Sequence, residues 1–137
     1  SIKANDPVWF GNDVGKFFTR QYGVMDINLF EFDRFYGTEF KMNKAERLEY
    51  GDSAMTHAMV FTGVDLKDNK PIKWRVENSW GGEHGEKGFD IMSDSWFGEF
   101  LYEVVISKKH LTKKLIELYN TEPIKLPPWD PMGSLAH

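Results

Sequence analysis

The chain has 137 residues, 41% of them hydrophobic and 15% aromatic, which suits one compact domain and is too little for two. Its 17 basic and 21 acidic residues give a formal charge of −4 without a basic cluster, so no nucleic-acid partner is expected. No apolar run approaches the roughly 20 residues of a membrane span, so a soluble chain without membrane contact is expected. The absence of cysteine excludes a disulfide framework, cysteine-ligated zinc and a thiol nucleophile within this sequence.

The first forty residues predict little regular structure beyond one short helix. Asn12 or Asp13 can cap a helix, because the apolar residues that follow have helical spacing. Those residues are Val14, Phe17, Phe18 and Tyr22. Residues 25–36 mix polar and apolar side chains without a clear period, and no element is assigned to them.

A second helix has a clear start and end. Asn43 followed three residues later by Glu46 predicts a capping box, in which each side chain bonds the other residue's backbone N–H. The helix is expected to continue through Tyr50 and to end at Gly51.

The middle of the chain predicts an antiparallel hairpin. Residues 57–64 are apolar on both faces, as in a buried strand, and residues 67–71 carry the turn signal Lys-Asp-Asn-Lys-Pro. Residues 72–77 then alternate apolar and charged side chains, which indicates a half-buried strand.

The remaining elements alternate between strand and helix before an extended end. A glycine-rich bend at 81–88 leads to strands at 89–92 and 102–107, with a turn or helical piece around Trp96. Leucines at helical spacing predict a terminal helix over 110–122. Four of the six prolines lie in 123–131, so residues 123–137 should form an extended arm without regular structure.

Two polar side chains are expected at neighbouring strand ends. His57 opens the first strand of the hairpin, and Asn78 follows the second strand 21 residues later. By parity Asn78 shares a face with Trp74 and Val76, so its amide should point inward and require a partner. An imidazole suits it, because the Asn78 oxygen can accept from one ring nitrogen while the other faces a nucleophile; Trp80 could cover that bond. On the residues alone, a histidine beside a buried strand is more often an ordinary core histidine.

Other polar residues have weaker claims to chemistry. Ser53 and Ser79 lack the strand-turn-helix elbow of a serine nucleophile and are expected to be hydrogen-bonding serines. Glu83, His84 and Glu86 lack metal-ligand spacing, so a solvated loop is expected there, with no metal and no cofactor.

Two further features have ordinary structural explanations. His110 follows two lysines and is expected at the surface. Trp74, Trp96 and Phe97 are expected to be core aromatics rather than a platform for nucleic-acid bases, because the surrounding charge is not basic.

Several runs resemble known sequence blocks. Residues 56–60, Thr-His-Ala-Met-Val, and 76–81, Val-Glu-Asn-Ser-Trp-Gly, are similar to the His and Asn blocks of papain-like cysteine peptidases, in that order. Within that clan, residues 7–16, 55–59 and 128–136 resemble the bleomycin hydrolase and aminopeptidase C family. The resemblance spans nearly the whole chain.

This resemblance implies an α+β fold of the papain-like type. Residues 1–122 are expected to be its β-rich carboxyl-terminal half, with an antiparallel sheet or barrel and flanking helices. Residues 123–137 are expected to be an arm that reaches the active-site cleft, where the carboxylate at Ala136 or His137 pairs with a substrate's α-ammonium. His57 is implied as the general base and acid, and Asn78 as its orienter.

The resemblance also implies that a second part of the enzyme is needed. The family's nucleophilic cysteine and oxyanion-hole glutamine lie upstream of anything that matches this sequence. The chain, which opens Ser-Ile-Lys-Ala without an initiator methionine, is therefore expected to be a fragment or processed form, inactive alone. The intact enzyme would be a cytoplasmic, homohexameric cysteine aminopeptidase that acts on peptides.

Two other functions stay open from the sequence. A non-catalytic assembly or regulatory module could use the proline-rich arm to bind a neighbouring subunit of a ring oligomer. An ordinary endopeptidase of the same clan is also conceivable, but an arm that reaches the cleft would exclude it.

Overall fold

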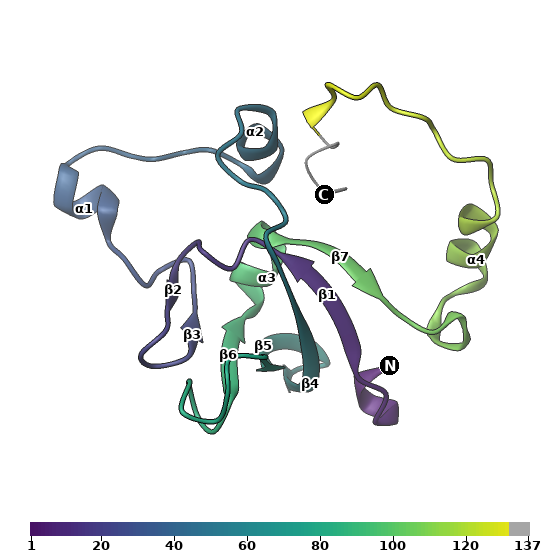
Figure 1. Ribbon diagram of the computed structural model, residues 1–137, viewed down its shortest axis with the longest axis horizontal. Helices are drawn as coiled ribbons and strands as arrows, with labels where there is room; N and C mark the ends of the chain where they lie inside the picture. Colours follow the sequence, from purple (N-terminus) through teal and green to yellow (C-terminus); the bar gives the residue numbers. More distant parts are fainter. Residues whose placement is uncertain (132–137) are drawn as a thin grey trace.

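The computed structural model describes residues 1–131, and its centre is one twisted sheet (Figure 1). In chain order the elements are η1 (Ile2–Ala4), β1 (Val8–Asn12), β2 (Phe18–Thr19), β3 (Val24–Met25), α1 (Phe32–Tyr36), α2 (Lys44–Glu49), β4 (His57–Lys67), β5 (Lys70–Glu77), β6 (Phe89–Ser93), α3 (Asp94–Phe100), β7 (Leu101–Val105), η2 (Lys108–His110) and α4 (Lys113–Tyr119). The helices are short, and α3 packs against β5 and β6, so the α+β class expected from the sequence is confirmed.

The sheet has seven strands in the order β2-β3-β6-β5-β4-β1-β7. Neighbouring strands are antiparallel except β3 and β6, which are parallel, so the sheet is mixed rather than purely antiparallel. The long hairpin of β4 and β5 lies at its centre, and strands from both ends of the chain flank it. The end of β5 and the start of β4 therefore meet at the open end of this hairpin, opposite its turn.

The predicted hairpin is confirmed, and its turn has a clear physical basis. Lys67 pairs with Lys70, so Asp68 and Asn69 alone form the connection. Both have positive φ, 51° and 61°, which is the backbone shape that two-residue hairpin turns require and that Asp and Asn tolerate. Strand β4 is buried mainly on one face, because Ala58 is exposed while Met59 is buried.

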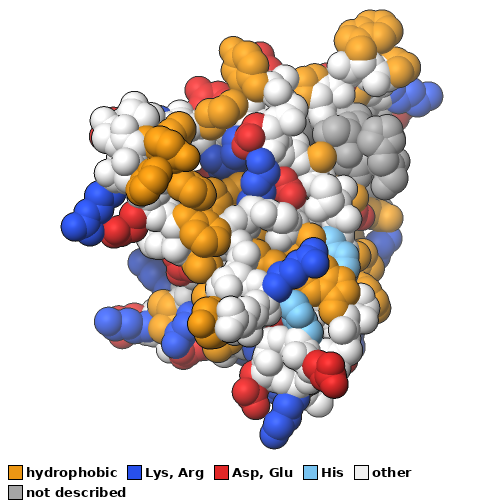
Figure 2. Space-filling view, turned by 60° about the vertical axis from the view of Figure 1, so that its left-hand side comes forward, with side chains coloured by type: hydrophobic (Ala, Val, Ile, Leu, Met, Phe, Trp, Pro, Cys, Tyr) orange, Lys and Arg blue, Asp and Glu red, His pale blue; other side chains and the backbone are white. Residues whose placement is uncertain are grey.

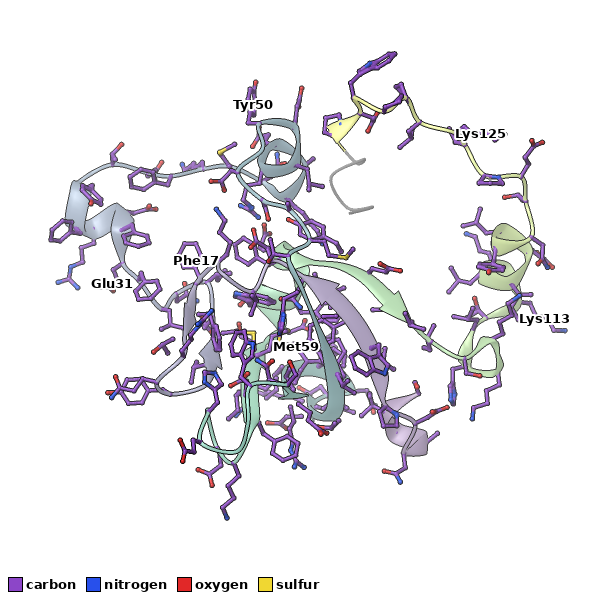
Figure 3. The ribbon with its side chains drawn as sticks, viewed as in Figure 1. Phe17, Glu31, Tyr50, Met59, Lys113 and Lys125 are labelled. Carbon is purple, nitrogen blue, oxygen red and sulfur yellow. The ribbon has the colours of Figure 1, made fainter. Side chains whose placement is uncertain are left out.

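The core lies between the central strands and α3. It includes ten buried hydrophobic residues, with Met59 pointing into its centre (Figure 3). Trp96 is fully buried and donates its indole N–H to the Lys16 carbonyl at 2.7 Å, so its expected role as a core aromatic is confirmed. Trp74 and Phe97 are partly buried and stack on each other against the same core, at 5.0 Å between ring centroids.

The helix predicted over residues 12–22 is wrong. Asn12 ends β1, where it pairs with His57 on one side and Leu101 on the other, and the following residues turn into β2 and β3. Phe17 has φ +45°, which no right-handed helix allows. The pairing of Asn12 with β4 and β7, and of Phe18 and Thr19 with β3, outweighs the local apolar spacing.

The predicted capping box is present, and the later helices are shorter than expected. The Asn43 side chain accepts from the Glu46 N–H, and the Glu46 side chain accepts from the Asn43 N–H. Helix α3 covers Trp96 as the sequence indicated, and it runs directly into β7. The terminal helix α4 begins at Lys113 rather than His110, because Thr112 caps it.

The chain after α4 continues as an arc beside the sheet (Figure 1). Residues 121–130 contain no helix or strand, and several of their apolar side chains are exposed, including Trp129 at 83%. In the described part of the chain, none of the helices is long and apolar enough to cross a membrane.

Candidate active site

His57 and Asn78 meet at the open end of the β4–β5 hairpin. The distance between His57 Nε2 and Asn78 Oδ1 is 3.0 Å, within hydrogen-bonding range. Both side chains are half-buried, so the pair is partly shielded from water while still reachable from one side. Figure 2 shows pale blue histidine side chains on one face of the molecule, beside orange hydrophobic and blue basic side chains.

The neighbours of Asn78 fix which way its amide points. Asn78 Oδ1 also accepts from the Ser79 backbone N–H at 2.9 Å, and Asn78 Nδ2 donates to Asp90 Oδ2 at 3.1 Å. A backbone N–H can only donate, and a carboxylate oxygen accepts, so the opposite amide orientation would lose both bonds. The oxygen of Asn78 therefore faces His57.

This orientation determines the tautomer of the neutral His57 ring. Because Asn78 presents an acceptor, His57 Nε2 must carry the hydrogen that it donates. The lone pair of the neutral ring then lies on Nδ1. The pair can thus supply a base at Nδ1 whose orientation and tautomer are set by the protein.

The strands hold the backbone of both residues. His57 opens β4 opposite Asn12, whose Nδ2 donates to the His57 carbonyl at 3.0 Å. Asn78 follows β5, and its N–H donates to the Gly88 carbonyl at 3.1 Å. Both positions are therefore fixed by pairing across the sheet rather than by a free loop.

Aromatic rings cover one side of the pair. The Trp80 ring stacks on His57, with 4.9 Å between centroids and an angle of 26° between planes. The edge of His84 meets Trp80 at the same centroid distance, and the Arg20 guanidinium lies 4.5 Å from the Trp80 ring. Such a cover excludes water and strengthens the hydrogen bond beneath it.

A carboxylate lies behind Asn78. Asp90 is fully buried on β6, and burial raises its pKa above the ordinary value, because the charged form loses its solvation. The hydrogen bond from Asn78 and the nearby charges of His84 and His57 lower the pKa, but they do not offset the effect of burial.

A pocket of about 430 Å³ opens beside His57. Trp9 and Gly11 of β1, Met55 before β4 and Glu103 of β7 contribute to its wall. The pocket could accept a small side chain or a peptide segment next to the imidazole.

The two serine candidates make structural hydrogen bonds. Ser53 is buried, and its hydroxyl donates to Asp13 Oδ2 at 2.8 Å. The same hydroxyl lies 2.6 Å from the hydroxyl of Tyr102. Ser79 contributes its backbone N–H to Asn78. Glu83 is exposed, as expected for a solvated loop, and residues 1–131 contain no group of three side chains suited to a metal.

Two other histidines differ from the positions expected from the sequence. His110 is half-buried rather than fully at the surface, with its Nε2 2.8 Å from Asp6 Oδ2. His84 is turned toward Trp80 instead of the solvent. Ala136 and His137 lie outside the described residues.

Sequence reasoning missed Asn12 and Asp90. Asn12 was assigned to a helix cap, although it is the buried end of a strand that holds His57. A signal for Asp90 existed, because it shares strand parity with the apolar Met92, so an acidic side chain had to face the core.

Comparison with known proteins places the chain in a family. Residues 1–133 match the model of the Peptidase C1-like family, and the chain belongs to that family. Its fold is therefore the papain-like α+β fold expected from the resemblance.

Individual members of the family are similar to this chain over nearly its whole length. The chain is 53% identical to bleomycin hydrolase from Mus musculus and 50% identical to aminopeptidase C from Listeria innocua, over 99% and 98% of its length. The crystal structure of pepw from Lactobacillus rhamnosis HN001 superposes with a TM-score of 0.88 at 55% identity, over 97% of this chain and 30% of that one. The chain spans 31% of the length of the two enzymes, in their carboxyl-terminal portion.

Proposed function

We propose that this chain supplies the catalytic histidine and asparagine of a cysteine aminopeptidase, whose nucleophilic thiol comes from residues outside this sequence. The observation that carries the proposal is the 3.0 Å bond between His57 Nε2 and Asn78 Oδ1, with the amide orientation set by its neighbours. Family membership and the absence of cysteine from the chain agree with it.

The chemistry is acyl transfer through a thioester. The thiol gives its proton to His57 Nδ1, and the resulting thiolate attacks the peptide carbonyl carbon. The tetrahedral intermediate collapses, the C–N bond breaks, and Nδ1 returns the proton to the leaving amine. His57 Nδ1 then takes a proton from water, which attacks the thioester and releases the acid and the thiol.

Asn78 and Trp80 support the charged form of His57. The imidazolium keeps its Nε2 hydrogen on Asn78 throughout, so the ring does not rotate between the two half-reactions. Trp80 stacks on His57 and limits the access of water to that bond.

Aminopeptidase selectivity would come from the carboxyl-terminal arm. The carboxylate at Ala136 or His137 would pair with the free α-ammonium of a peptide and block longer amino-terminal extensions. By likeness to the bleomycin hydrolase and aminopeptidase C relatives, the intact protein is proposed to be a cytoplasmic homohexamer that needs no cofactor.

The test is an aminopeptidase assay on the full-length protein that contains this sequence. Aminoacyl-aminocoumarin substrates with a free and with an acetylated α-amine are compared for the wild type, His57→Ala and Asn78→Ala. We expect cleavage of the free-amine substrate only, loss of kcat by about 10³-fold or more for His57→Ala, and a smaller loss for Asn78→Ala.

His110→Ala is the matched control, because His110 also has a polar side-chain partner at its Nε2, but that partner, Asp6, precedes β1, whereas His57 pairs with Asn12 at the other end of this strand. It should retain the wild-type kcat. Full activity of His57→Ala would overturn the catalytic role, whereas equal cleavage of the acetylated substrate would overturn only the aminopeptidase selectivity.

A further inference from the structure

Asp90 occupies a position that strands normally give to an apolar side chain. It alternates with exposed Ile91 on β6, faces the core like Met92, and has no solvent exposure. A buried carboxylate is costly unless it is paired or hydrogen-bonded, so its contacts indicate what it does.

Two glycines let the backbone close around this carboxylate. A Cβ added at Gly23 or at Gly85 would lie 2.7 Å from Asp90 Oδ1, and both glycines have positive φ, 61° and 53°. The carboxylate is therefore enclosed by the turn before β3 and the loop before β6. Water has little access to it.

The Asp90 carboxylate is hydrogen-bonded to Asn78 of the proposed catalytic pair. Asp90 Oδ2 accepts from Asn78 Nδ2 at 3.1 Å, while Asp90 Oδ1 makes no hydrogen bond and lies 3.8 Å from His84 Nε2. His84 Nε2 is likewise buried without a hydrogen bond. The charges of His84 and His57 both lower the pKa of this carboxylate.

Without the Asp90 carboxylate, neither orientation of the Asn78 amide would satisfy all of its hydrogen bonds. With an apolar residue at position 90, Nδ2 would be buried unpaired, which costs about 1–3 kcal/mol. Flipping the amide would turn Nδ2 toward the Ser79 N–H, so that two donors face each other. Because both arrangements are unfavourable, we expect Asn78 to leave this position in part of the molecules, and His57 then loses the acceptor that sets its tautomer.

We infer that Asp90 is a positioning residue, whose oxygen holds the Asn78 amide in the one orientation that lets His57 act through Nδ1. The inference rests on the proposed function, since it assigns a further residue to the same site. The chain of contacts runs from Asp90 to Asn78 to His57, and Asp90 acts through Asn78 without touching the substrate. The raised pKa of Asp90 agrees with this role, because neutral and charged forms both retain an accepting oxygen for Asn78.

Three substitutions in the full-length enzyme test this role. Asp90→Leu removes the acceptor, whereas Asp90→Asn keeps one oxygen for Asn78 Nδ2 and can turn its own NH₂ toward His84 Nε2. We expect Asp90→Leu to lower kcat about 10-fold to 100-fold, the range found for outer partners that orient metal-bound histidines, with KM unchanged. Asp90→Asn should recover most of that loss. Asp90→Val, which is smaller, replaces Asp90→Leu if the latter does not fold.

Asp94→Leu is the matched control. Asp94 also accepts a side-chain N–H, from Trp74 Nε1 at 3.0 Å, but it lies at the start of α3 and this bond does not involve His57 or Asn78. Its removal should leave kcat unchanged, although it can lower the melting temperature.

The outcomes separate this inference from the proposed function. If His57→Ala is inactive while Asp90→Leu and Asp90→Val keep the wild-type kcat, the role of Asp90 is wrong and the proposed function stands. Equal losses for Asp90→Asn and Asp90→Leu would also overturn it, because the acceptor would then not be what matters. An active His57→Ala variant would instead remove the proposed function itself.

Discussion

Asn78 connects every part of the site at the scale of single residues. Its oxygen serves His57 and the Ser79 backbone, and its nitrogen serves Asp90. These three bonds have ordinary lengths, so the orientation of the amide is maintained without strain. The position of one amide thus decides whether His57 can act as a base.

The buried carboxylate makes a prediction about stability and pH. Because burial raises the pKa of Asp90 above its ordinary 3.8, the folded state binds this proton more tightly than the unfolded state. The stability from this protonation is fully present below pH 3.8 and is lost as the pH rises through the raised value. Asp90→Asn does not titrate, so it should gain in melting temperature relative to the wild type between pH 4 and pH 7.

Thermal denaturation of the full-length wild type and Asp90→Asn across that range measures the effect. A difference in melting temperature that does not change with pH would show that Asp90 has the same proton affinity in both states.

At the scale of elements, the turn of the β4–β5 hairpin should matter for stability. Asn69 has φ +61° at a position where glycine is unstrained and β-branched residues are disfavoured. Asn69→Val should destabilise the protein by about 1–2 kcal/mol, whereas Asn69→Gly should be neutral or slightly stabilising. Urea unfolding compares the two, and equal stability of both variants would contradict the assigned turn geometry.

The sequence predicts those elements whose signal is local. The hairpin, the capping box at Asn43 and the helical piece around Trp96 each have a clear period, turn or cap, and all are present. The helix expected after Asn12 is absent because Asn12 itself pairs with β4 and β7, which are distant in sequence, and Phe18 and Thr19 form β2, which pairs with β3. Local spacing cannot report such pairing.

The candidate site divides in the same way. Strand parity and the hairpin predict that His57 and Asn78 meet, and the structure brings them to 3.0 Å, whereas their catalytic roles come from the family resemblance. The roles of Asn12 and Asp90 could not be predicted from the sequence, because their contacts depend on where β1 and β6 lie in the sheet. An acidic residue at an inward position is the one sequence signal that pointed to Asp90.

At the scale of the whole molecule, the exposed aromatic residues predict self-association of the isolated 137-residue chain. Phe35 is 80% exposed and Tyr36 63%, and other aromatics along residues 22–40 are exposed as well. Figure 2 shows hydrophobic side chains gathered on one face. In the proposed enzyme such surface would contact other parts of the protein. Analytical ultracentrifugation of the isolated chain should therefore show oligomers, and a monomer that unfolds cooperatively would contradict this.

The central claim is that His57 activates a thiol from outside this chain, and thiol alkylation tests it most directly. The rate of modification by iodoacetamide is measured against pH for the full-length wild type and His57→Ala. An imidazolium partner stabilises the thiolate, so the wild type should react well below the ordinary cysteine pKa of about 8.5, while His57→Ala should react only as the pH approaches that value. Identical pH profiles for the two proteins would contradict the account.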